Sequence, residues 1–138
     1  MKQDSGKSQT ILVVEDDPGL LRFLVQALKV SGYTPLGAES AQAARELVAQ
    51  QHVDLAIVDI GLPDGDGIEL GQALASERGI PFIHLTGQLG DESIERAAKS
   101  GAITYLVKPV AIEQLAAAVA TALTRATEIS KLMRSVEK

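Results

Sequence analysis

Five side chains that could do chemistry stand directly after short apolar runs in this 138-residue chain. They are Glu15, Asp16, Asp59, Thr86 and Lys108. Carboxylates without a histidine or cysteine partner at useful spacing favour a hard cation such as Mg²⁺ or Ca²⁺. An ammonium group and a hydroxyl group can bind the oxygens of a phosphoryl group. The residue types therefore indicate a site for phosphate chemistry that uses a divalent cation.

Asp59 is the candidate nucleophile of this set. Carboxylates a few ångströms apart raise each other's pKa unless a cation intervenes. Mg²⁺ typically takes one or two carboxylates together with waters and phosphate oxygens, which suits an open site. With the metal and Lys108 balancing the negative charge, Asp59 can attack phosphorus. Each residue alone has a simpler explanation as a cap or turn residue, but their joint occurrence after successive apolar runs favours function.

Short apolar runs alternate with amphipathic segments along the chain. This alternation predicts a βα unit repeated five times, which would bring these residues together. The expected strands are 11–14, 33–37, 55–58, 82–85 and 103–107. Runs that are apolar throughout predict a parallel sheet with helices on both faces. The carboxyl ends of such strands meet at one rim, where ligands bind. Pro35 cannot donate to a ladder, so we expect the second strand at a sheet edge.

Helix and turn signals separate these strands. Asp17 with Pro18 predicts the start of a helix, and Ser40 predicts the N-cap of the next one. The Gly-, Pro- and Asp-rich segment 61–67 predicts a turn followed by a helix through Leu74, because the ligand spacing of a calcium loop is not met.

Composition excludes several classes of protein. A net charge of −5 and a sequence pI of about 5.0 argue against direct binding of nucleic acid. The absence of cysteine removes disulfides, thiolate metal sites and cysteine catalysis. No apolar run reaches the ~20 residues that span a bilayer, and 1–9 lacks the apolar core of a secretory signal. We therefore expect a cytoplasmic protein that is not bound to membranes. Neither histidine has a metal-ligand partner at useful spacing, so we expect His84 in the core and His52 on the surface.

Four segments resemble the receiver domain of two-component response regulators. They are ILVVEDDP at 11–18, DLAIVDIGLPDGDG at 54–67, HLTG at 84–87 and GAITYLVKP at 101–109. The resemblance covers about residues 10–125 and implies a flavodoxin-like α/β fold with a five-stranded parallel sheet of order 2-1-3-4-5. It also implies a cis bond between Lys108 and Pro109.

The same resemblance implies a phosphorylation-dependent signalling switch. Asp59 would accept a phosphoryl group from the phosphohistidine of a sensor histidine kinase or phosphotransfer protein. Mg²⁺ would be held by Glu15 or Asp16, Asp59 and the backbone carbonyl of Gly61. Lys108 would bind the phosphoryl group, Thr86 would move toward it, and Tyr105 would turn inward. The altered surface would comprise the helix ending near Ser100, strand 103–107 and the helix after Pro109.

The chain departs from the family pattern beside the expected phosphoryl group and beyond the last strand. Gly61 has no side chain two residues after the acceptor, and Gln88 occupies the matching place after Thr86. Ile103-Thr104 replaces the acidic pair that many DNA-binding members carry, and Val110 replaces a frequent aromatic residue. The last two departures make it less expected that two receiver domains pair here as they do in those transcription factors.

The final helix predicts a second functional element. Its apolar residues Ile112, Leu115, Val119, Ala122, Ala126, Ile129, Met133 and Val136 alternate at spacings of three and four. This is the pattern of a coiled coil, although packing of the first half on the domain core explains part of it. We expect a flexible segment 1–9, a receiver domain 10–125 and a helical extension 126–138 that forms a homodimer or leads to an output module.

Two other functions compete with the switch. A phosphohydrolase with an aspartyl nucleophile would need a second acid/base, and the residue two positions after Asp59 is not acidic. A scaffold that no longer reacts would act through its helical extension, but every reactive position is filled. The sequence therefore favours a phosphoacceptor that is not an enzyme, beyond self-catalysed phosphotransfer and dephosphorylation.

Overall fold

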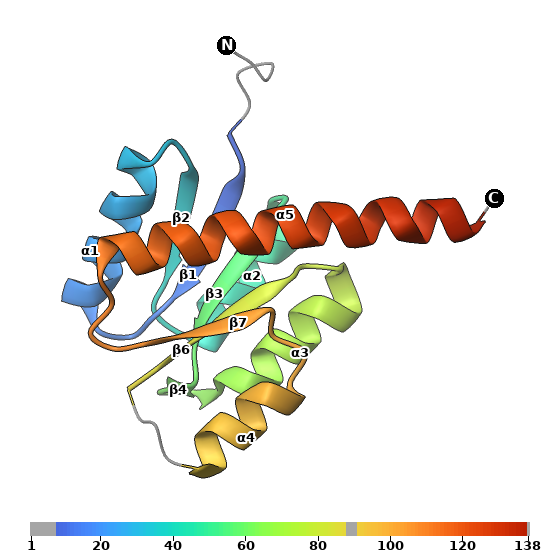
Figure 1. The fold of residues 1–138 in the computed structure, drawn as a ribbon. Coiled ribbons are helices and arrows are strands. Elements are labelled where there is room, and N and C mark those ends of the chain that lie inside the picture. The colour runs from blue at the N-terminus through green and yellow to red at the C-terminus, as the bar shows by residue number, and fades with distance from the viewer. Residues whose placement is uncertain (1–7, 88–90, 138) are drawn as a thin grey trace.

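A five-stranded parallel sheet forms the centre of the computed structural model, which describes residues 8–87 and 91–137. Its strands are β1 (Thr10–Val14), β2 (Thr34–Ala38), β3 (Leu55–Asp59), β6 (Phe82–Thr86) and β7 (Thr104–Val107). Their order is β2-β1-β3-β6-β7, which confirms the predicted order 2-1-3-4-5 when sheet strands alone are counted (Figure 1). The strand that contains Pro35 lies at an edge, as predicted.

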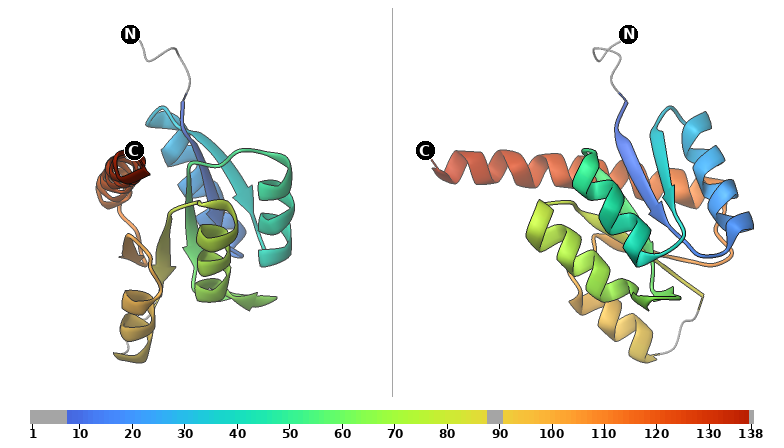
Figure 2. Two further views of the ribbon diagram at one scale, coloured as in Figure 1. Left: turned by 90° about the vertical axis from the view of Figure 1, so that its right-hand side faces the viewer. Right: turned by 180° about the vertical axis from the view of Figure 1, so that it is seen from behind.

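Two apolar layers cover the sheet (Figures 1 and 2). Side chains that alternate along the strands enter one core with α1 (Pro18–Val30) and α5 (Ile112–Glu137). The other side chains of the same strands pack against α2 (Ala41–Gln50) and α3 (Gly67–Arg78). Strands that are buried on both faces explain why the central runs are apolar without alternation.

The strand register aligns the carboxyl ends at one rim of the sheet. Val14 pairs with Val58, and Asp59 pairs with Leu85. Thr86 in turn pairs with Val107, the residue before Lys108. The polar residues that follow β1, β3, β6 and β7 therefore come to one end of the fold, as the sequence predicts.

Local capping agrees with the helix signals. The Asp17 side chain accepts hydrogen bonds from two N–H groups in the first turn of α1, and Ser40 accepts one from Ala43. Helix α3 continues four residues beyond the predicted Leu74, to Arg78, and ends at Gly79 with a left-handed φ of 68°. The predicted end was wrong because Ala75 to Arg78 are good helix formers, and the glycine that can adopt this conformation comes after them.

The predicted turn 61–67 contains a two-stranded antiparallel hairpin, β4 (Gly61–Leu62) and β5 (Gly65–Asp66). At its tip, Asp64 accepts hydrogen bonds from the N–H groups of Ala41 (2.8 Å) and Gln42 (3.0 Å). These donors lower the pKa of Asp64. The hairpin is thereby attached to the N-terminus of α2, which fixes the loop that follows β3.

Helix α5 continues well past the sheet (Figures 1 and 2). Leu115, Val119 and Ala122 are buried in the core, whereas Ile129 and Met133 are more than half exposed. Packing on the core therefore explains the first half of the coiled-coil pattern but not the second. In the described part of the chain, no helix is long and apolar enough to cross a membrane.

Candidate functional site

Glu15 follows β1 and is fully buried. Its N–H donates to the carbonyl oxygen of Ala38 at 3.0 Å, so the turn after β1 is bonded to the edge strand. One carboxylate oxygen, Oε2, accepts a hydrogen bond from the Asp17 N–H at 2.9 Å. The other, Oε1, lies 2.9 Å from Lys108 Nζ in an ion pair but accepts no hydrogen bond of good geometry. Glu15 thus presents an incompletely bonded oxygen at the rim.

Asp59 is the last residue of β3 and is 5% exposed. Its Oδ1 accepts a hydrogen bond from the Gly61 N–H at 3.2 Å, and its Oδ2 accepts one from Lys108 Nζ at 3.0 Å. Both carboxylate oxygens are therefore held in defined directions, although the Gly61 contact is a long one.

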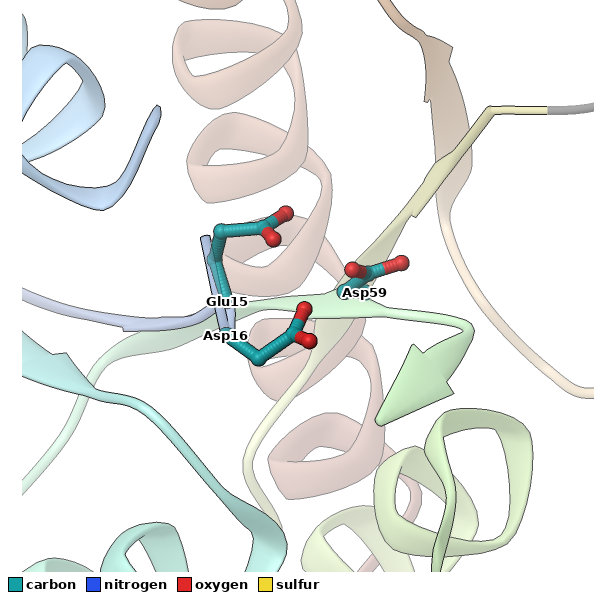
Figure 3. A group of neighbouring side chains, drawn as sticks. All are labelled: Glu15, Asp16 and Asp59. Carbon is teal, nitrogen blue, oxygen red and sulfur yellow. The ribbon is translucent and has the colours of Figure 1, made fainter. Parts of the chain in front are cut away.

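The carboxylates of Glu15, Asp16 and Asp59 face a common space (Figure 3). One oxygen from each lies within 4.8 Å of the others. Glu15 and Asp59 are buried, whereas Asp16 is exposed, so the cluster opens to solvent on the Asp16 side. Three oxygen donors with one open side fit Mg²⁺, which keeps waters and tolerates few protein ligands. The ion pair of Glu15 Oε1 with Lys108 Nζ, at 2.9 Å, shows that the buried carboxylate already faces positive charge at this place.

Burial and neighbouring charges shift the pKa values of Glu15 and Lys108. Burial and the neighbouring Asp59 raise the pKa of Glu15, although the Asp17 N–H and Lys108 oppose this effect. Burial alone would lower the pKa of Lys108, but its contacts with Glu15 and Asp59 raise it. Lys108 therefore stays positively charged and partly neutralises a site with three carboxylates.

Thr86 and Tyr105 lie on the neighbouring strands β6 and β7. Thr86 is buried, and its carbonyl oxygen accepts a hydrogen bond from the Lys108 N–H at 2.9 Å. Tyr105 is paired in register with His84 and is 41% exposed, so its ring lies at the surface. The Lys108-Pro109 bond is cis, as expected. Gln88, which we expected beside the phosphoryl group, lies outside the described residues.

Gly67 is a site residue whose specific role could not be predicted from the sequence. Its N–H donates to the carbonyl oxygen of Ile60 at 2.8 Å. A Cβ atom at Gly67 would lie 1.8 Å from the carbonyl oxygen of Asp59, far inside van der Waals contact. Only glycine lets the N-terminus of α3 approach the Asp59 backbone so closely. The Asp-Gly-Asp-Gly pattern signals a turn, but this approach depends on the tertiary structure.

An ion pair between Asp66 and Arg96 was also missed from the sequence. Asp66 is the N-cap of α3, and Arg96 belongs to α4 (Asp91–Lys99). Burial alone would raise the pKa of Asp66, but Arg96 and the Ile68 N–H lower it. Nothing at a separation of thirty residues signals such a pair. It ties α4 to the loop that begins at the Asp59 rim.

Comparison with known protein families gives one match over most of the chain. The model described as "Response regulator receiver domain" matches residues 11–120. "Transcriptional regulatory protein PdtaR" of Mycobacterium tuberculosis (strain ATCC 25618 / H37Rv) is 35% identical over 130 residues, or 94% of this chain. The "KDP operon transcriptional regulatory protein KdpE" of Escherichia coli (strain K12) is 38% identical over 115 residues, or 83% of this chain. The chain spans 63% and 51% of the length of these relatives, respectively.

Solved structures show the same architecture. A receiver domain protein described as CheY-like, from Methanospirillum hungatei JF-1, superposes with a TM-score of 0.82 at 29% identity. The match covers 88% of this chain and 98% of that one. The signal receiver domain of an HD domain-containing protein from Pseudomonas fluorescens Pf-5 gives 0.83 at 31% identity, covering 88% and 99%.

Proposed function

Since this chain belongs to the response regulator receiver domain family, we propose that it is a switch that accepts a phosphoryl group on Asp59. The observation that carries the proposal is the position of Lys108 Nζ, 3.0 Å from Asp59 and 2.9 Å from Glu15. One cation at the junction of two buried carboxylates supplies the positive charge that a carboxylate nucleophile needs beside it when it attacks a phosphoryl group.

Phosphoryl transfer needs charge stabilisation around the transferred group more than covalent chemistry from the protein. Asp59 Oδ attacks phosphorus, and the bond from phosphorus to the donor nitrogen of a phosphohistidine breaks. Lys108 exchanges part of its contact with Asp59 for an oxygen of the new acyl phosphate. The Thr86 hydroxyl, at the end of the neighbouring strand, donates to another oxygen.

Glu15, Asp16, Asp59 and the backbone carbonyl of Gly61 are the proposed ligands of Mg²⁺. When bound, the ion supplies positive charge to the carboxylates and to the phosphoryl oxygens. Glu15 and Asp16 direct their carboxylates to the space beside Asp59, and the buried surroundings of Glu15 keep that side of the site dry. Gly61 is held beside Asp59 by its own N–H contact.

The proposed output is a rearrangement along β6 and β7. Thr86 follows the phosphoryl group, and Tyr105 turns from the surface into the space that Thr86 leaves. The exposed position of the Tyr105 ring is the starting state that this step requires. The surface formed by α4, β7 and α5 changes as a result.

The proposed partners follow from this role. A sensor histidine kinase or a phosphotransfer protein supplies the phosphoryl group in the cytoplasm, and the chain binds neither nucleic acid nor membranes directly. We take 10–125 as the receiver domain and 126–138 as a helical extension for homodimer formation. The exposed Ile129, Leu132 and Met133 support this division, because a monomeric helix gains nothing from exposing them. Self-catalysed phosphotransfer and dephosphorylation are the only proposed reactions.

Incubation with Mg²⁺ and acetyl phosphate, followed by intact-mass measurement, tests the proposal. The expected result is one added phosphoryl group that disappears in Asp59→Asn and under chelation. The matched control is Asp54→Asn, because Asp54 lies at the opposite end of β3 and bonds Thr10 and His52. A folded protein that gains no phosphoryl group, or gains one equally well in Asp59→Asn, would contradict the proposal.

A further inference from the structure

His84 is a fully buried histidine that the proposed phosphotransfer does not use. It lies in β6 between Ile83 and Leu85, whose side chains join the core with α1 and α5. Because side chains alternate along a strand, His84 points to the opposite face, together with Phe82. The two rings meet edge to face, with centroids 5.1 Å apart and an interplanar angle of 69°. This places the imidazole on the face that bears α3.

One hydrogen bond, made by Nδ1, defines the tautomer of His84. Nδ1 lies 3.3 Å from the carbonyl oxygen of Val58. A carbonyl can only accept, so Nδ1 carries the proton and donates it. Burial lowers the pKa of His84, which keeps the ring neutral. Nε2 is consequently a bare acceptor.

That acceptor lacks a donor among the side chains that the structure describes. None of residues 8–87 and 95–135 forms a hydrogen bond with His84 Nε2. Asp66, Arg96 and Asp59 are charged groups whose electric fields act on the ring. Arg96 is the donor among them, and it is paired with Asp66. A buried acceptor without a partner is unusual and destabilises the state that contains it.

Tyr105 carries a hydroxyl donor on the neighbouring strand. The parallel register pairs Tyr105 with His84 and Leu106 with Leu85. Leu85 and Leu106 both enter the core with α1 and α5, so His84 and Tyr105 share the opposite face of the sheet. The Tyr105 ring is 41% exposed, and in this outward position its hydroxyl forms no hydrogen bond with His84 Nε2. Neighbouring strands lie about 4.8 Å apart, so two side chains in register on one face can reach each other when both lie against the sheet.

We infer that Tyr105, when it turns inward, donates its hydroxyl proton to Nε2 of His84. The inference rests on the proposed switch and adds a positioning residue to it. The outward state leaves a buried acceptor unsatisfied, and the inward state satisfies it. His84 thereby favours the inward position of Tyr105 once the phosphoryl group has drawn Thr86 aside.

Nitrogen-15 NMR of the histidine rings tests this contact directly. The chain has two histidines, so the exposed His52 serves as an internal reference. Wild-type protein and Tyr105→Phe are compared before and after addition of Mg²⁺ and beryllofluoride, and fluorine NMR reports whether the phosphoryl mimic is bound. We expect the Nε2 signal of His84 to move upfield on binding in the wild type and to stay in place in Tyr105→Phe, which keeps the ring but lacks the donor.

The two possible failures are distinguishable. Absence of bound fluoride signals in the wild type would count against the proposed function. Bound fluoride with an unchanged His84 Nε2, or with the same change in Tyr105→Phe, would overturn only the contact between Tyr105 and His84.

A double-mutant cycle provides an independent measurement. Tyr105→Phe removes one buried hydrogen bond of the inward state and should therefore weaken the binding of beryllofluoride roughly two- to tenfold. In a His84→Leu background, the same substitution should change the affinity by less than about twofold, because the acceptor is already gone. Equal losses in both backgrounds would show that the hydroxyl of Tyr105 acts elsewhere.

Discussion

Nζ of Lys108 lies 3.0 Å from Oδ2 of Asp59, although the two residues are 49 positions apart and belong to the ends of different strands. The same ammonium group lies 2.9 Å from Glu15. A single lysine therefore bridges two buried carboxylates and sets the charge balance of the rim. Most of the expected behaviour of the site follows from this arrangement.

Replacement of Lys108 by glutamine should destabilise the metal-free protein by roughly 2–3 kcal/mol, because Glu15 and Asp59 lose their shared cation while buried. Mg²⁺ should restore more stability to this variant than it adds to the wild type, since it no longer competes with an ammonium group. Urea unfolding with Mg²⁺ or with chelator measures both effects. Lys99→Gln, at an exposed position of α4, is the control, and equal effects of Mg²⁺ on wild type and Lys108→Gln would contradict the prediction.

Asp16→Asn should have the opposite effect on the metal-free protein. Removing one of three clustered carboxylates relieves repulsion, and we expect a gain of about 1 kcal/mol at neutral pH. The stabilisation that Mg²⁺ provides should shrink in the same variant. Thermal unfolding with and without Mg²⁺ provides the measurement, with Glu39→Gln as an exposed residue of equal charge. A loss of stability in chelator would be the contrary outcome.

Gly67→Ala should cost at least about 3 kcal/mol of stability or displace the loop after β3, because its Cβ would lie 1.8 Å from the Asp59 carbonyl oxygen. Gly65→Ala provides a matched control two residues earlier, where the nearest atom to the new Cβ is 3.9 Å away. Chemical denaturation of the two variants should separate them clearly. Similar midpoints would show that α3 can shift away from Asp59 at little cost.

The stability of the protein should fall on acidification because His84 is buried in its neutral form. Burial lowers its pKa below the usual 6.5 of histidine, so below about pH 6.5 the unfolded chain binds a proton that the folded protein does not. The free energy of unfolding then decreases by at most about 1.4 kcal/mol per pH unit, until the pH reaches the lowered folded pKa. His84→Leu should flatten the curve between these two values, whereas Phe82→Leu, a buried substitution on the same strand that removes no ionisable group, should leave its slope unchanged. Urea unfolding at a series of pH values measures the curve.

The exposed end of α5 should make the protein dimerise. Ile129 is 52% exposed, Leu132 66% and Met133 61%, and they share one side of the helix. Ile129→Asp should raise the dissociation constant of the dimer about tenfold or more, because a charge would be buried where the two helices meet. Sedimentation velocity over a range of concentrations measures the change, and Lys131→Asp on another side of the helix is the control. A wild-type protein that stays monomeric at high concentration would contradict a dimer formed through this end of α5.

The convergence of the residues that follow the strands could be predicted from the chain alone. Glu15, Asp59 and Lys108 stand after apolar runs, and parallel strands necessarily bring their carboxyl ends to one rim. The position of Pro35 similarly predicted the edge strand, because its missing N–H is a property of the residue itself. These inferences succeeded because they depend on local residue chemistry and on a rule that holds for all such sheets.

Other features were decided by the tertiary structure. Asp66 and Arg96 pair across thirty residues, and the Cβ of any residue but glycine at position 67 would collide with Asp59. His84 was expected in the core, but its unsatisfied Nε2 depends on which atoms surround the ring in space. Sequence patterns record the period of burial and the chemistry of each residue. Distances between side chains on different elements arise only when the helices pack on the sheet, and they decide which hydrogen bonds are made.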